Sequence, residues 1–390
     1  MRKVTLRNVT VNDRLAVNIR IESPLPNVQY RLRIDRGTLL KPTHINRLKN
    51  EGVRSIYVID QDTRDLAKYV HDEDLKEAER ETVQELQKTA RAIKDENVYQ
   101  VPAEELSESV QDLLDVIRDT SVSMAYTSLK SHTNYLANHQ FDTCKLTLQF
   151  ALEHADELLD QYRSEHSSGS LSSDIFLEQL GMGTLLHDVG NWSIPQETLE
   201  KREELNSVEW EAIKEHPKLG FDMLGDFDDI PRLARMPALH HHERYSGQGY
   251  PKGLAGQEIH YLGRIAAICD VYAALTSERP YRIELTPNRA IGIMKNMQEG
   301  EEPAFDPDLM DKFLDLIPPY PIGQDVVLDN GKRGVVSGLD EGFQTPTIRV
   351  LFDGNEKLDE YYEIVVNTDD NDEPRTLWNP GNNILLSGGR

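Results

Sequence analysis

The sequence is poor in cysteine and has no long hydrophobic run. Only two of its 390 residues are cysteines, Cys144 and Cys269, and they lie far apart. Two isolated cysteines exclude a disulfide framework and a zinc site built from thiolates. No apolar run approaches the roughly 20 residues of a membrane span, and no basic-then-apolar signal opens the chain. We therefore expect a cytoplasmic protein in which nitrogen and oxygen atoms bind any metal ion.

Positive charge is also scarce. The 43 Lys and Arg residues are outnumbered by 67 Asp and Glu residues, which gives a formal net charge of -24. This excess argues against a protein that binds DNA or an anionic membrane through general electrostatics. We therefore expect any anionic ligand to be held by a local site.

Histidine, by contrast, is concentrated in one part of the chain. Nine of the 12 histidines lie between positions 139 and 260: His139, His154, His166, His187, His216, His240, His241, His242 and His260. Local enrichment in histidine indicates metal binding.

The two ends of the chain differ in texture from its middle. Residues 1–62 alternate short apolar runs with turn signals and predict a small α+β domain, with a helix over residues 43–51 ended by Gly52. Residues 63–130 are highly charged, with apolar residues at helical spacing, and predict a helical connector. This connector is either a signalling or dimerising element or a solvated helix packed on its own chain.

Residues 131–316 predict a helical bundle. Asn206 and Glu209 have the spacing of a capping box, so a helix is expected to start near residue 207 and to run past His216. Thr286 and Asp306 each precede a proline that suits the first position of a helix.

β-type runs replace the helical pattern after the prolines at 318–321. Asn330-Gly331 separates two of these runs and is a strong hairpin signal, so residues 320–368 predict a small β-barrel-like domain. Residues 369–390 read as a flexible tail. The expected fold is mainly α: a helical-bundle domain flanked by a small N-terminal α+β module and a small C-terminal β domain.

Seven side chains in the helical segment are candidate metal ligands. His187-Asp188 ends an apolar stretch, and Asp270 interrupts an apolar helix, so their burial is costly unless a partner such as a metal ion compensates it. A His-Asp pair alone is weak evidence, but neutral imidazoles and carboxylates together suit first-row metal ions. The full set is His139, His187, Asp188, His216, His241, His242 and Asp270. Seven donors exceed the need of one ion and suit a two-metal site for phosphoester cleavage.

The order of these ligands resembles that of the HD-GYP family, a subgroup of the HD-domain metal-dependent phosphohydrolases. The segment His-His-Glu-Arg-Tyr-Ser-Gly-Gln-Gly-Tyr-Pro at 241–251 carries the resemblance, which extends through residues 264–272 and 274–282. It covers about residues 131–316. The N-terminal module looks more loosely like an accessory domain that often precedes HD-GYP domains.

The resemblance implies a phosphodiesterase that hydrolyses cyclic di-GMP, in second-messenger signalling, to the linear dinucleotide or on to GMP. It places one metal ion on His139, His187, Asp188 and Asp270, and a second on His216, His241 and His242, with Asp188 bridging. His187 and Asp188 thereby become the central catalytic residues, around a hydroxide held between two divalent ions. Iron or manganese is expected.

The resemblance also implies contacts outside the metal ligands. The expected substrate contacts are Asn191, Lys218, Arg244, Tyr250, Arg279 and Arg282. The Gly-Tyr-Pro loop implies a surface for signalling partner proteins, and a homodimer is an open possibility. Arg264 is expected to join Arg279 and Arg282 in a local positive pocket. His240 is expected beside the ligands rather than among them, and His154, His166 and His260 on the surface.

Four positions depart from the family pattern. Asn191 stands where a lysine is usual, Ser246 and Ala273 each replace a usual aspartate, and Tyr135 replaces the glutamate of three-metal members, which favours two metals. The departures keep two alternatives open. One is a weak or inactive HD-GYP-like sensor or scaffold that binds a cyclic dinucleotide or partner proteins, and the other is a phosphohydrolase acting on another nucleotide.

Overall fold

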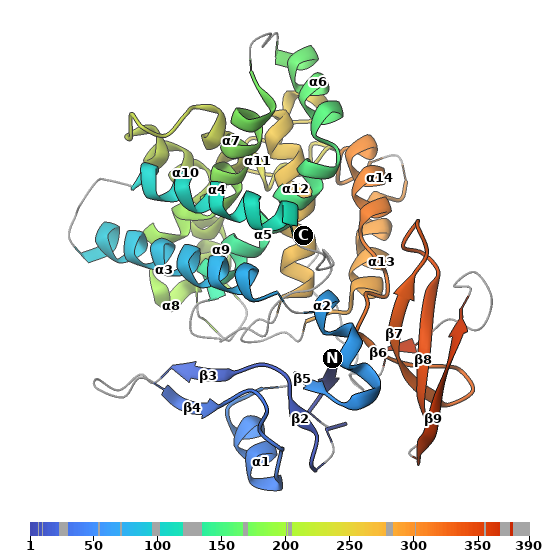
Figure 1. The fold of residues 1–390 in the computed structure, drawn as a ribbon. Coiled ribbons are helices and arrows are strands. Elements are labelled where there is room, and N and C mark those ends of the chain that lie inside the picture. Colours follow the sequence, from blue (N-terminus) through green and yellow to red (C-terminus); the bar gives the residue numbers. More distant parts are fainter. Residues whose placement is uncertain are drawn as a thin grey trace. The chain divides into compact units, whose positions relative to one another are not determined.

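The structure is a computed structural model that places most of the chain in two compact units. It describes residues 1–6, 8–9, 11–22, 30–53, 55–70, 72–95, 102–119, 135–166, 171–199, 201, 205–277, 284–300, 302–354, 356–366 and 375–376. One unit comprises residues 1–71 together with residues 318–390, and the other comprises residues 72–317. The ribbon of Figure 1 shows a helical unit and a unit that contains the strands. The predicted class, mainly α with flanking α+β and β parts, is confirmed.

The helical unit is built around three central helices. These are α5 (Tyr135–Glu153), α7 (Ser173–Leu185) and α12 (Tyr261–Thr276), which pack against one another or against shared neighbours. Around them lie α3 (Glu73–Asp95), α4 (Ala103–Asp119), α6 (Ala155–His166), α8 (Gln196–Leu199), α9 (Ser207–Lys214), α10 (His216–Gly225), α11 (Met236–His240), α13 (Pro287–Gln298) and α14 (Pro307–Leu316). Short 3-10 turns, η3 (Val189–Ser193), η4 (Leu233–Arg235) and η5 (Gly256–Glu258), connect some of them. Helices α3 and α4, from the segment predicted as a connector, pack against α5 and α7.

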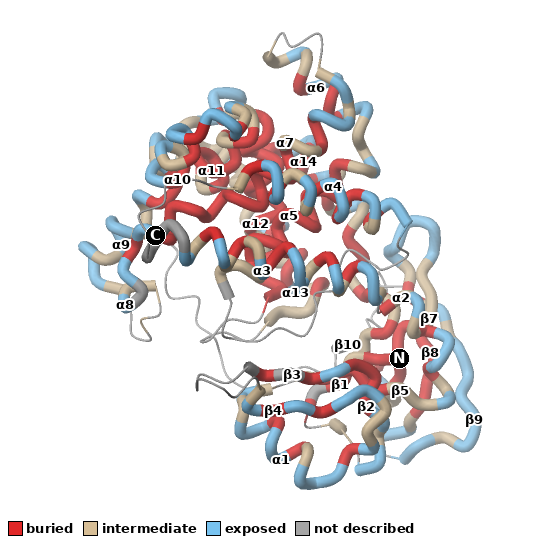
Figure 2. The backbone as a smooth tube through the Cα atoms, turned by 60° about the vertical axis from the view of Figure 1, so that its left-hand side comes forward, coloured by how far each residue is buried: buried red, intermediate tan, exposed pale blue. Residues whose placement is uncertain are grey.

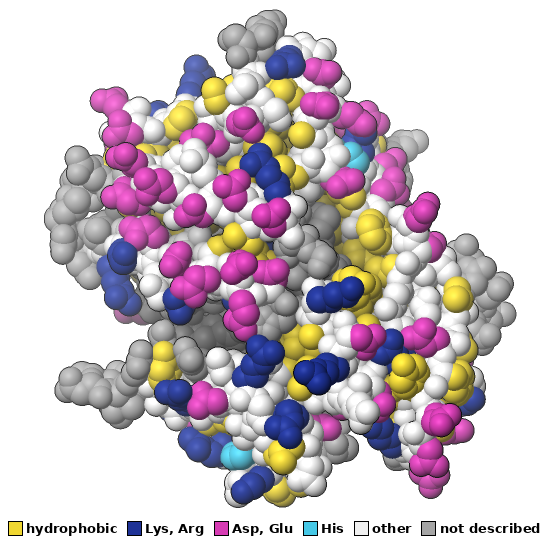
Figure 3. Space-filling model, viewed as in Figure 1, with side chains coloured by type: hydrophobic (Ala, Val, Ile, Leu, Met, Phe, Trp, Pro, Cys, Tyr) yellow, Lys and Arg dark blue, Asp and Glu magenta, His cyan; other side chains and the backbone are white. Residues whose placement is uncertain are grey.

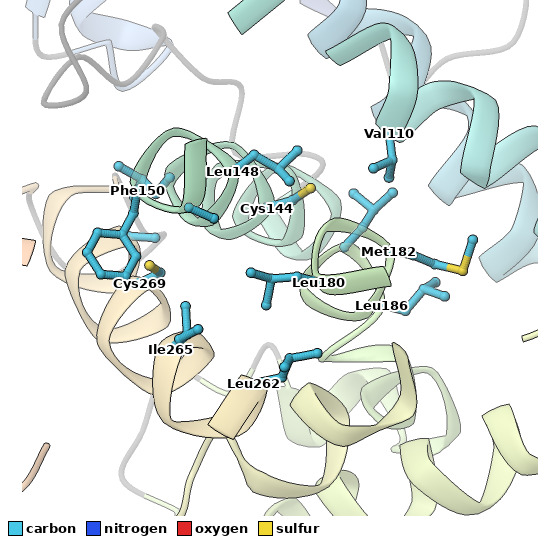
Figure 4. Packing of buried hydrophobic residues seen from close by; sticks show 14 of the residues in the cluster. Val110, Cys144, Leu148, Phe150, Leu180, Met182, Leu186, Leu262, Ile265 and Cys269 are labelled. Carbon is cyan, nitrogen blue, oxygen red and sulfur yellow. The ribbon is translucent and has the colours of Figure 1, made fainter. Parts of the chain in front are cut away.

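The core of this unit is an apolar layer between α5, α7 and α12. Figure 4 shows Leu180 of α7 pointing into the space between Cys144 and Cys269, with Leu262 and Ile265 of α12 nearby. In Figure 2 the tubes of α5 and α12 are red over much of their length, as expected for helices buried on most sides. Burial raises the pKa of both cysteine thiols to about 12, so both are small core residues, as predicted.

Capping and proline signals located three helix starts correctly. Asn206 and Glu209 form the predicted capping box at the start of α9, and α13 and α14 begin at Pro287 and Pro307. The prediction of one helix that continues past His216 is wrong, because α9 ends at Lys214 and α10 begins at His216. Pro217 explains the break, since proline lacks the backbone N–H that would donate to the Ile213 carbonyl, which His216 Nδ1 contacts instead.

The other unit contains three sheets and a short helix. In the N-terminal part, β1 (Arg2–Thr5), β5 (Ser55–Ile59) and β2 (Arg14–Leu15) form a sheet in the order β1-β5-β2. Strands β3 (Ile19–Glu22) and β4 (Tyr30–Ile34) form a hairpin, and α1 (Pro42–Asn50) ends before Gly52 as predicted. A 3-10 turn, η1 (Gln61–Leu66), and α2 (Ala67–Val70) follow β5.

The C-terminal strands form an open antiparallel sheet. Its strands are β6 (Asp325–Val327), β7 (Lys332–Leu339), β8 (Pro346–Asp353), β9 (Glu356–Val365) and β10 (Arg375–Thr376), in the order β10-β6-β7-β8-β9. Gly331 has a φ of 83° in the predicted hairpin between β6 and β7. The positive φ is the reason that Asn-Gly was a reliable signal there.

Ion pairs join the N-terminal and C-terminal parts of this unit. Arg2 donates to both carboxylate oxygens of Asp325, at 3.2 and 3.0 Å, and both side chains are buried. The Arg349 guanidinium on β8 donates to the carboxylate of Asp65, with one N–O distance of 2.7 Å. Two segments more than 250 residues apart in sequence therefore share one folded unit.

Among the described residues, no helix combines the length and the apolar character needed to cross a bilayer.

Candidate metal centre

The seven predicted ligands come from five separate places in the helical unit. His139 lies on α5 and Asp270 on α12, whereas His187 and Asp188 follow the end of α7. His216 is the first residue of α10, and His241 and His242 follow α11 directly. Three of the five places are therefore helix ends or their immediate continuation, where a side chain can leave the packed core, whereas His139 and Asp270 lie within helices.

The structure brings all seven side chains together in two neighbouring groups. One group contains Asp188, His216, His241 and His242, and the other contains His139, His187 and Asp270; within each group, the donor atoms lie within 4.8 Å of one another. His139 Nε2 lies 2.8 Å from Asp270 Oδ1. Asp188 touches both groups, because Oδ1 lies 3.1 Å from His216 Nε2 and Oδ2 lies 3.6 Å from His187 Nε2.

Backbone carbonyls orient three of the histidines. His187 Nδ1 lies 2.7 Å from the Thr184 carbonyl, and His216 Nδ1 lies 2.7 Å from the Ile213 carbonyl. His241 Nδ1 lies 2.9 Å from the carbonyl of Pro237. A carbonyl can only accept, so each Nδ1 carries the proton and each neutral ring offers the Nε2 lone pair to the site.

The arrangement of the imidazole nitrogens is better explained by a bound cation than by hydrogen bonds among the side chains. His216 Nε2 and His241 Nε2 lie 3.2 Å apart, although Nδ1 of both rings faces a carbonyl. Two lone pairs would then face each other. His187 Nε2 is buried and has no hydrogen-bond partner among the described residues. A cation bound to these nitrogens would satisfy both arrangements.

Burial and opposite charges compete in setting the protonation of the site. Burial lowers the pKa of His139 and His241 and places that of His242 well below its usual value, which favours the neutral ligand form. Burial raises the pKa of Asp188, but the surrounding His187, His216 and His241 outweigh it and hold the pKa well below its usual value. Deprotonated carboxylates and neutral imidazoles are the forms that bind metal ions.

Glycines allow the elements of the site to approach closely. A Cβ on Gly190 would lie 2.0 Å from the His216 carbonyl oxygen and 2.7 Å from the Gly220 nitrogen. A Cβ on Gly263 would lie 2.4 Å from the Cβ of His240. The first contact sets η3 against the start of α10, and the second sets α12 against α11. Both therefore determine how Asp188 and Asp270 meet the histidines.

The loop after His242 folds over the second group. The Tyr250 ring stacks on the His242 ring, with centroids 4.7 Å apart and planes at 29°. The Tyr250 backbone N–H donates to the His242 carbonyl at 3.1 Å. A Cβ on Gly249 would lie 2.3 Å from the Arg244 nitrogen, so only glycine fits this close approach.

Glu243 is a structural residue of this loop that the sequence analysis missed. Its carboxylate is buried, and it accepts from the backbone N–H of Lys252 at 2.8 Å and of Leu254 at 3.0 Å. The side chain thus closes the loop that carries Tyr250. Its position directly after two ligand histidines was the available signal, since an acidic residue there is costly to bury without donors.

We expect Glu243→Gln to loosen this loop without removing a metal donor. The amide can accept from one of the two backbone N–H groups but offers its own donors to the other, so the free energy of unfolding should fall by about 1–3 kcal/mol. Hydrogen exchange should speed up at the Lys252 and Leu254 amides. Glu258→Gln is the matched control, because Glu258 is exposed and accepts from the Ala255 N–H at 3.1 Å. If the Lys252 and Leu254 amides exchanged as slowly in the Glu243→Gln variant as in the original protein, the assignment would be contradicted.

The predicted substrate contacts differ in their surroundings. Asn191 is buried in η3, and its N–H donates to the Asp188 carbonyl at 3.0 Å. Arg244 is partly buried and donates to the carbonyls of His241 and Glu243, each at 3.0 Å. Lys218 is exposed on α10 and pairs with Asp222 at 3.1 Å. Arg279, Arg282 and the side chain of Tyr135 lie outside the described residues.

The expectation that Arg264 helps to form a positive pocket is wrong. Its guanidinium is buried and forms ion pairs with Glu165 and Asp306, so two carboxylates surround one cation. The Asp306 carboxylate also caps α14, because it accepts from the backbone N–H groups of Asp308 and Leu309. Arg264 therefore ties α12 to α6 and to the start of α14.

Three of the remaining histidines, His240, His260 and His166, form a separate packed row. His240 belongs to neither metal group, as expected, and its Nδ1 accepts from the His260 N–H at 2.9 Å. The rings of His166 and His260 lie 4.4 Å apart. The prediction that these two lie on the surface is wrong, since both are half-buried.

This row predicts a loss of stability in acid. Burial lowers the pKa of His240 to about 4. In the unfolded chain, the His240 imidazole binds a proton near pH 6.5. The free energy of unfolding is therefore at its full value above pH 6.5 and falls by about 3 kcal/mol as the pH is lowered towards 4. Chemical denaturation across this pH range measures the free energy of unfolding. We expect it to depend less steeply on pH in His240→Gln, whose amide oxygen can still accept from the His260 N–H. An unchanged pH dependence would contradict the prediction.

Comparisons with known proteins agree with the resemblance seen in the sequence. A family model described as HD domain matches residues 149–309. An HDG"Y"P protein of Bdellovibrio bacteriovorus has a similar fold, with a TM-score of 0.50 and 14% identity, over 80% of this chain and 98% of that one. The family model agrees with the predicted HD-type domain, and the structural similarity shows a shared fold.

Curated relatives are similar over part of their length. A cyclic di-GMP phosphodiesterase of Pseudomonas aeruginosa is 32% identical over 62% of this chain and 54% of its own. The cyclic di-GMP phosphodiesterase response regulator RpfG of Xanthomonas campestris is 35% identical over 39% of this chain and 41% of its own. A 3'3'-cGAMP-specific phosphodiesterase of Vibrio cholerae is 35% identical over 36% of this chain and 30% of its own. The match thus spans about half or less of each relative.

Proposed function

We propose that this chain, whose helical unit contains an HD domain of the HD-GYP type, is a metal-dependent phosphodiesterase that hydrolyses cyclic di-GMP. The observation that carries the proposal is the convergence of seven nitrogen and oxygen donors in two adjoining groups with Asp188 between them. Two divalent ions bound there would activate a water molecule and offset charge on a phosphoryl oxygen. Iron or manganese suits a set of five imidazoles and two carboxylates.

The residues of the chain would hold and orient this chemistry. Asp188 would bridge the ions, with His139, His187 and Asp270 on one side and His216, His241 and His242 on the other. The carbonyls at Thr184, Ile213 and Pro237 keep the Nε2 atoms of three rings directed inward. Tyr250 and Arg244 lie beside the second group, where they could contact the dinucleotide.

One experiment tests the enzyme proposal directly. Protein purified without added metal is analysed for bound metal and then incubated with cyclic di-GMP, with iron and separately with manganese. We expect about two metal ions per chain and the appearance of linear dinucleotide or GMP. Protein that binds both ions and shows no product with either metal would overturn the proposal.

A catalytically weak sensor or scaffold is the second candidate function. Asn191 favours it, because this residue is buried beside Asp188 and offers no positive charge to a phosphate. Ser246 and Ala273 likewise bring no carboxylate where the family pattern has one. This candidate predicts tight binding of cyclic di-GMP without turnover. Asn191→Lys should then create or strongly raise turnover, whereas a true enzyme should change only modestly.

A different cyclic dinucleotide is a further candidate substrate. The similarity to a 3'3'-cGAMP-specific phosphodiesterase supports testing 3'3'-cGAMP beside cyclic di-GMP. The ratio of kcat/KM for the two substrates decides between them. Docking of signalling proteins on the Gly-Tyr-Pro loop and a homodimer stay predictions.

A further inference from the structure

The C-terminal end of α7 lacks the glycine that often closes a helix. The last four carbonyls of an α-helix have no N–H partner inside the helix, and a following residue in the left-handed conformation commonly helps to satisfy them. Leu186 follows α7 with a φ of -103°, outside that conformation. Its N–H donates to the Met182 carbonyl at 3.0 Å. The carbonyls of Thr184 and Leu185 lie beyond this bond and need other donors.

Two side chains contact these carbonyls. His187 Nδ1 lies 2.7 Å from the Thr184 carbonyl, and Gln140 Nε2 on α5 donates to the Leu185 carbonyl at 3.1 Å. Thr184 and Leu185 are consecutive residues, and His187 and Asp188 follow directly after Leu186. The Gln140 amide therefore holds the peptide group next to the one that orients a ligand histidine.

Close packing of α5 on α7 makes this contact possible. Gln140 and Cys144 lie one turn apart on α5, and their partners, the carbonyls of Leu185 and Gly181, lie one turn apart on α7. The Cys144 Sγ lies 3.3 Å from the Gly181 carbonyl oxygen. A Cβ on Gly181 would lie 2.9 Å from Leu148 Cδ2 of α5. The row of contacts along α7 thus ends immediately before the ligand pair.

Gln140 is enclosed in the protein, as the metal centre is. Its relative exposure is 0%, and its Oε1 has no hydrogen-bond partner among the described residues. On the face of the helical unit drawn in Figure 3, acidic side chains predominate and little histidine is visible, in keeping with a centre that lies below the surface. Leu185 is fully buried as well, so loss of the Gln140 N–H would leave a buried carbonyl without its donor.

We propose that Gln140 is a positioning residue that fixes the turn carrying His187 and Asp188. The turn is short, since the Val189 N–H donates back to the Leu186 carbonyl at 3.1 Å. A movement of the peptide group after Leu185 therefore shifts both ligands together. Asp188 lies between the two groups of donors, so its position sets how one carboxylate spans them. This inference rests on the proposed two-metal site and adds to it a residue that acts through the backbone.

Substitution by methionine tests the proposal on the full chain, because methionine has nearly the shape of glutamine but no N–H. We expect Gln140→Met to bind Mn²⁺ about 10–100-fold less tightly in equilibrium dialysis, the usual cost of losing a group that orients a metal ligand. The electron paramagnetic resonance signal of two coupled Mn²⁺ ions should weaken at equal occupancy, because the coupling depends on the bridging carboxylate. In metal-free protein, hydrogen exchange at the Leu186 and Val189 amides should speed up.

Gln149→Met is the matched control. Gln149 lies on the same helix, about two and a half turns beyond Gln140, and its Oε1 is also buried without a partner among the described residues. Mn²⁺ affinity and exchange at the two amides should stay within about twofold of the original, since sites more than about 10 Å apart rarely couple. If Gln140→Met does not fold, Gln140→Asn gives the same comparison, because its amide is one methylene too short to reach Leu185.

The outcomes separate this proposal from the enzymatic one. Equal weakening of Mn²⁺ binding in the Gln140 and Gln149 variants would overturn the positioning role, and so would unchanged affinity and exchange in Gln140→Met. An original protein that binds two Mn²⁺ ions without hydrolysing cyclic di-GMP would overturn the enzymatic proposal alone. Weaker Mn²⁺ binding in Gln140→Met, with normal binding in Gln149→Met, would then still support the role of Gln140. An original protein that binds no divalent ion would overturn both.

Discussion

Replacing Gly190 by alanine is expected to disrupt the metal centre and to destabilise the fold. The new methyl group would lie 2.0 Å from the His216 carbonyl and 2.7 Å from the Gly220 nitrogen, and backbone atoms cannot rotate away as a side chain can. Either η3 or α10 must move, which separates Asp188 from His216. We expect the free energy of unfolding to fall by about 3 kcal/mol or more, and turnover of cyclic di-GMP to fall at least about 100-fold.

The control for this variant is another glycine to alanine change in the same unit. Gly292 lies in α13, and a Cβ there would have no heavy atom within 4 Å. Gly292→Ala should leave metal content unchanged and raise stability by roughly 0.5–1 kcal/mol, because alanine favours a helix. Metal analysis, thermal unfolding and turnover of both variants provide the comparison. A Gly190→Ala protein with full metal content would show that the close approach is dispensable.

Replacing Asp188 by asparagine should abolish activity while keeping the fold. The amide has the shape of the carboxylate, but it lacks the negative charge that would bridge two cations between His187 and His216. We expect a loss of turnover of about 1,000-fold or more and fewer bound metal ions per chain. Circular dichroism should remain that of the original protein.

Asp226→Asn controls for the loss of one aspartate charge. Asp226 lies at the end of α10 and is exposed, so metal content and turnover should stay within about twofold of the original, as for surface substitutions in general. If Asp188→Asn retained two metal ions and turnover, the bridging role would have to be abandoned. A loss of metal with retained binding of cyclic di-GMP would still agree with it.

The ligand set could be predicted because ligation depends on residue type and order. His187-Asp188 and His241-His242 are adjacent in sequence, and Asp270 stands out as a carboxylate within an apolar helix. Their convergence follows once the helices pack, since five ligands lie at helix ends and His139 and Asp270 lie on the facing helices α5 and α12. Asn206 and Asp306 located helix starts for a similar reason, because capping depends on neighbours a few residues away, and Pro287 marked the start of α13.

Features that depend on tertiary contacts were missed or mistaken. Arg264 was expected to contribute to a positive pocket, but its carboxylate partners are 99 and 42 residues away in sequence. Glu243 closes a loop through the backbone N–H groups of Lys252 and Leu254, which no side-chain pattern reveals.

The ion pairs between Arg2 and Asp325, and between Asp65 and Arg349, bear on how this protein can be dissected. They make residues 72–317 an insertion within a unit whose two parts are separated in sequence. Removing either part alone would leave a buried charge of the other without its partner, a loss that typically costs about 3–5 kcal/mol. A chimaera with a relative must therefore exchange residues 1–71 and 318–390 together. Residues 72–317 are the segment to express alone.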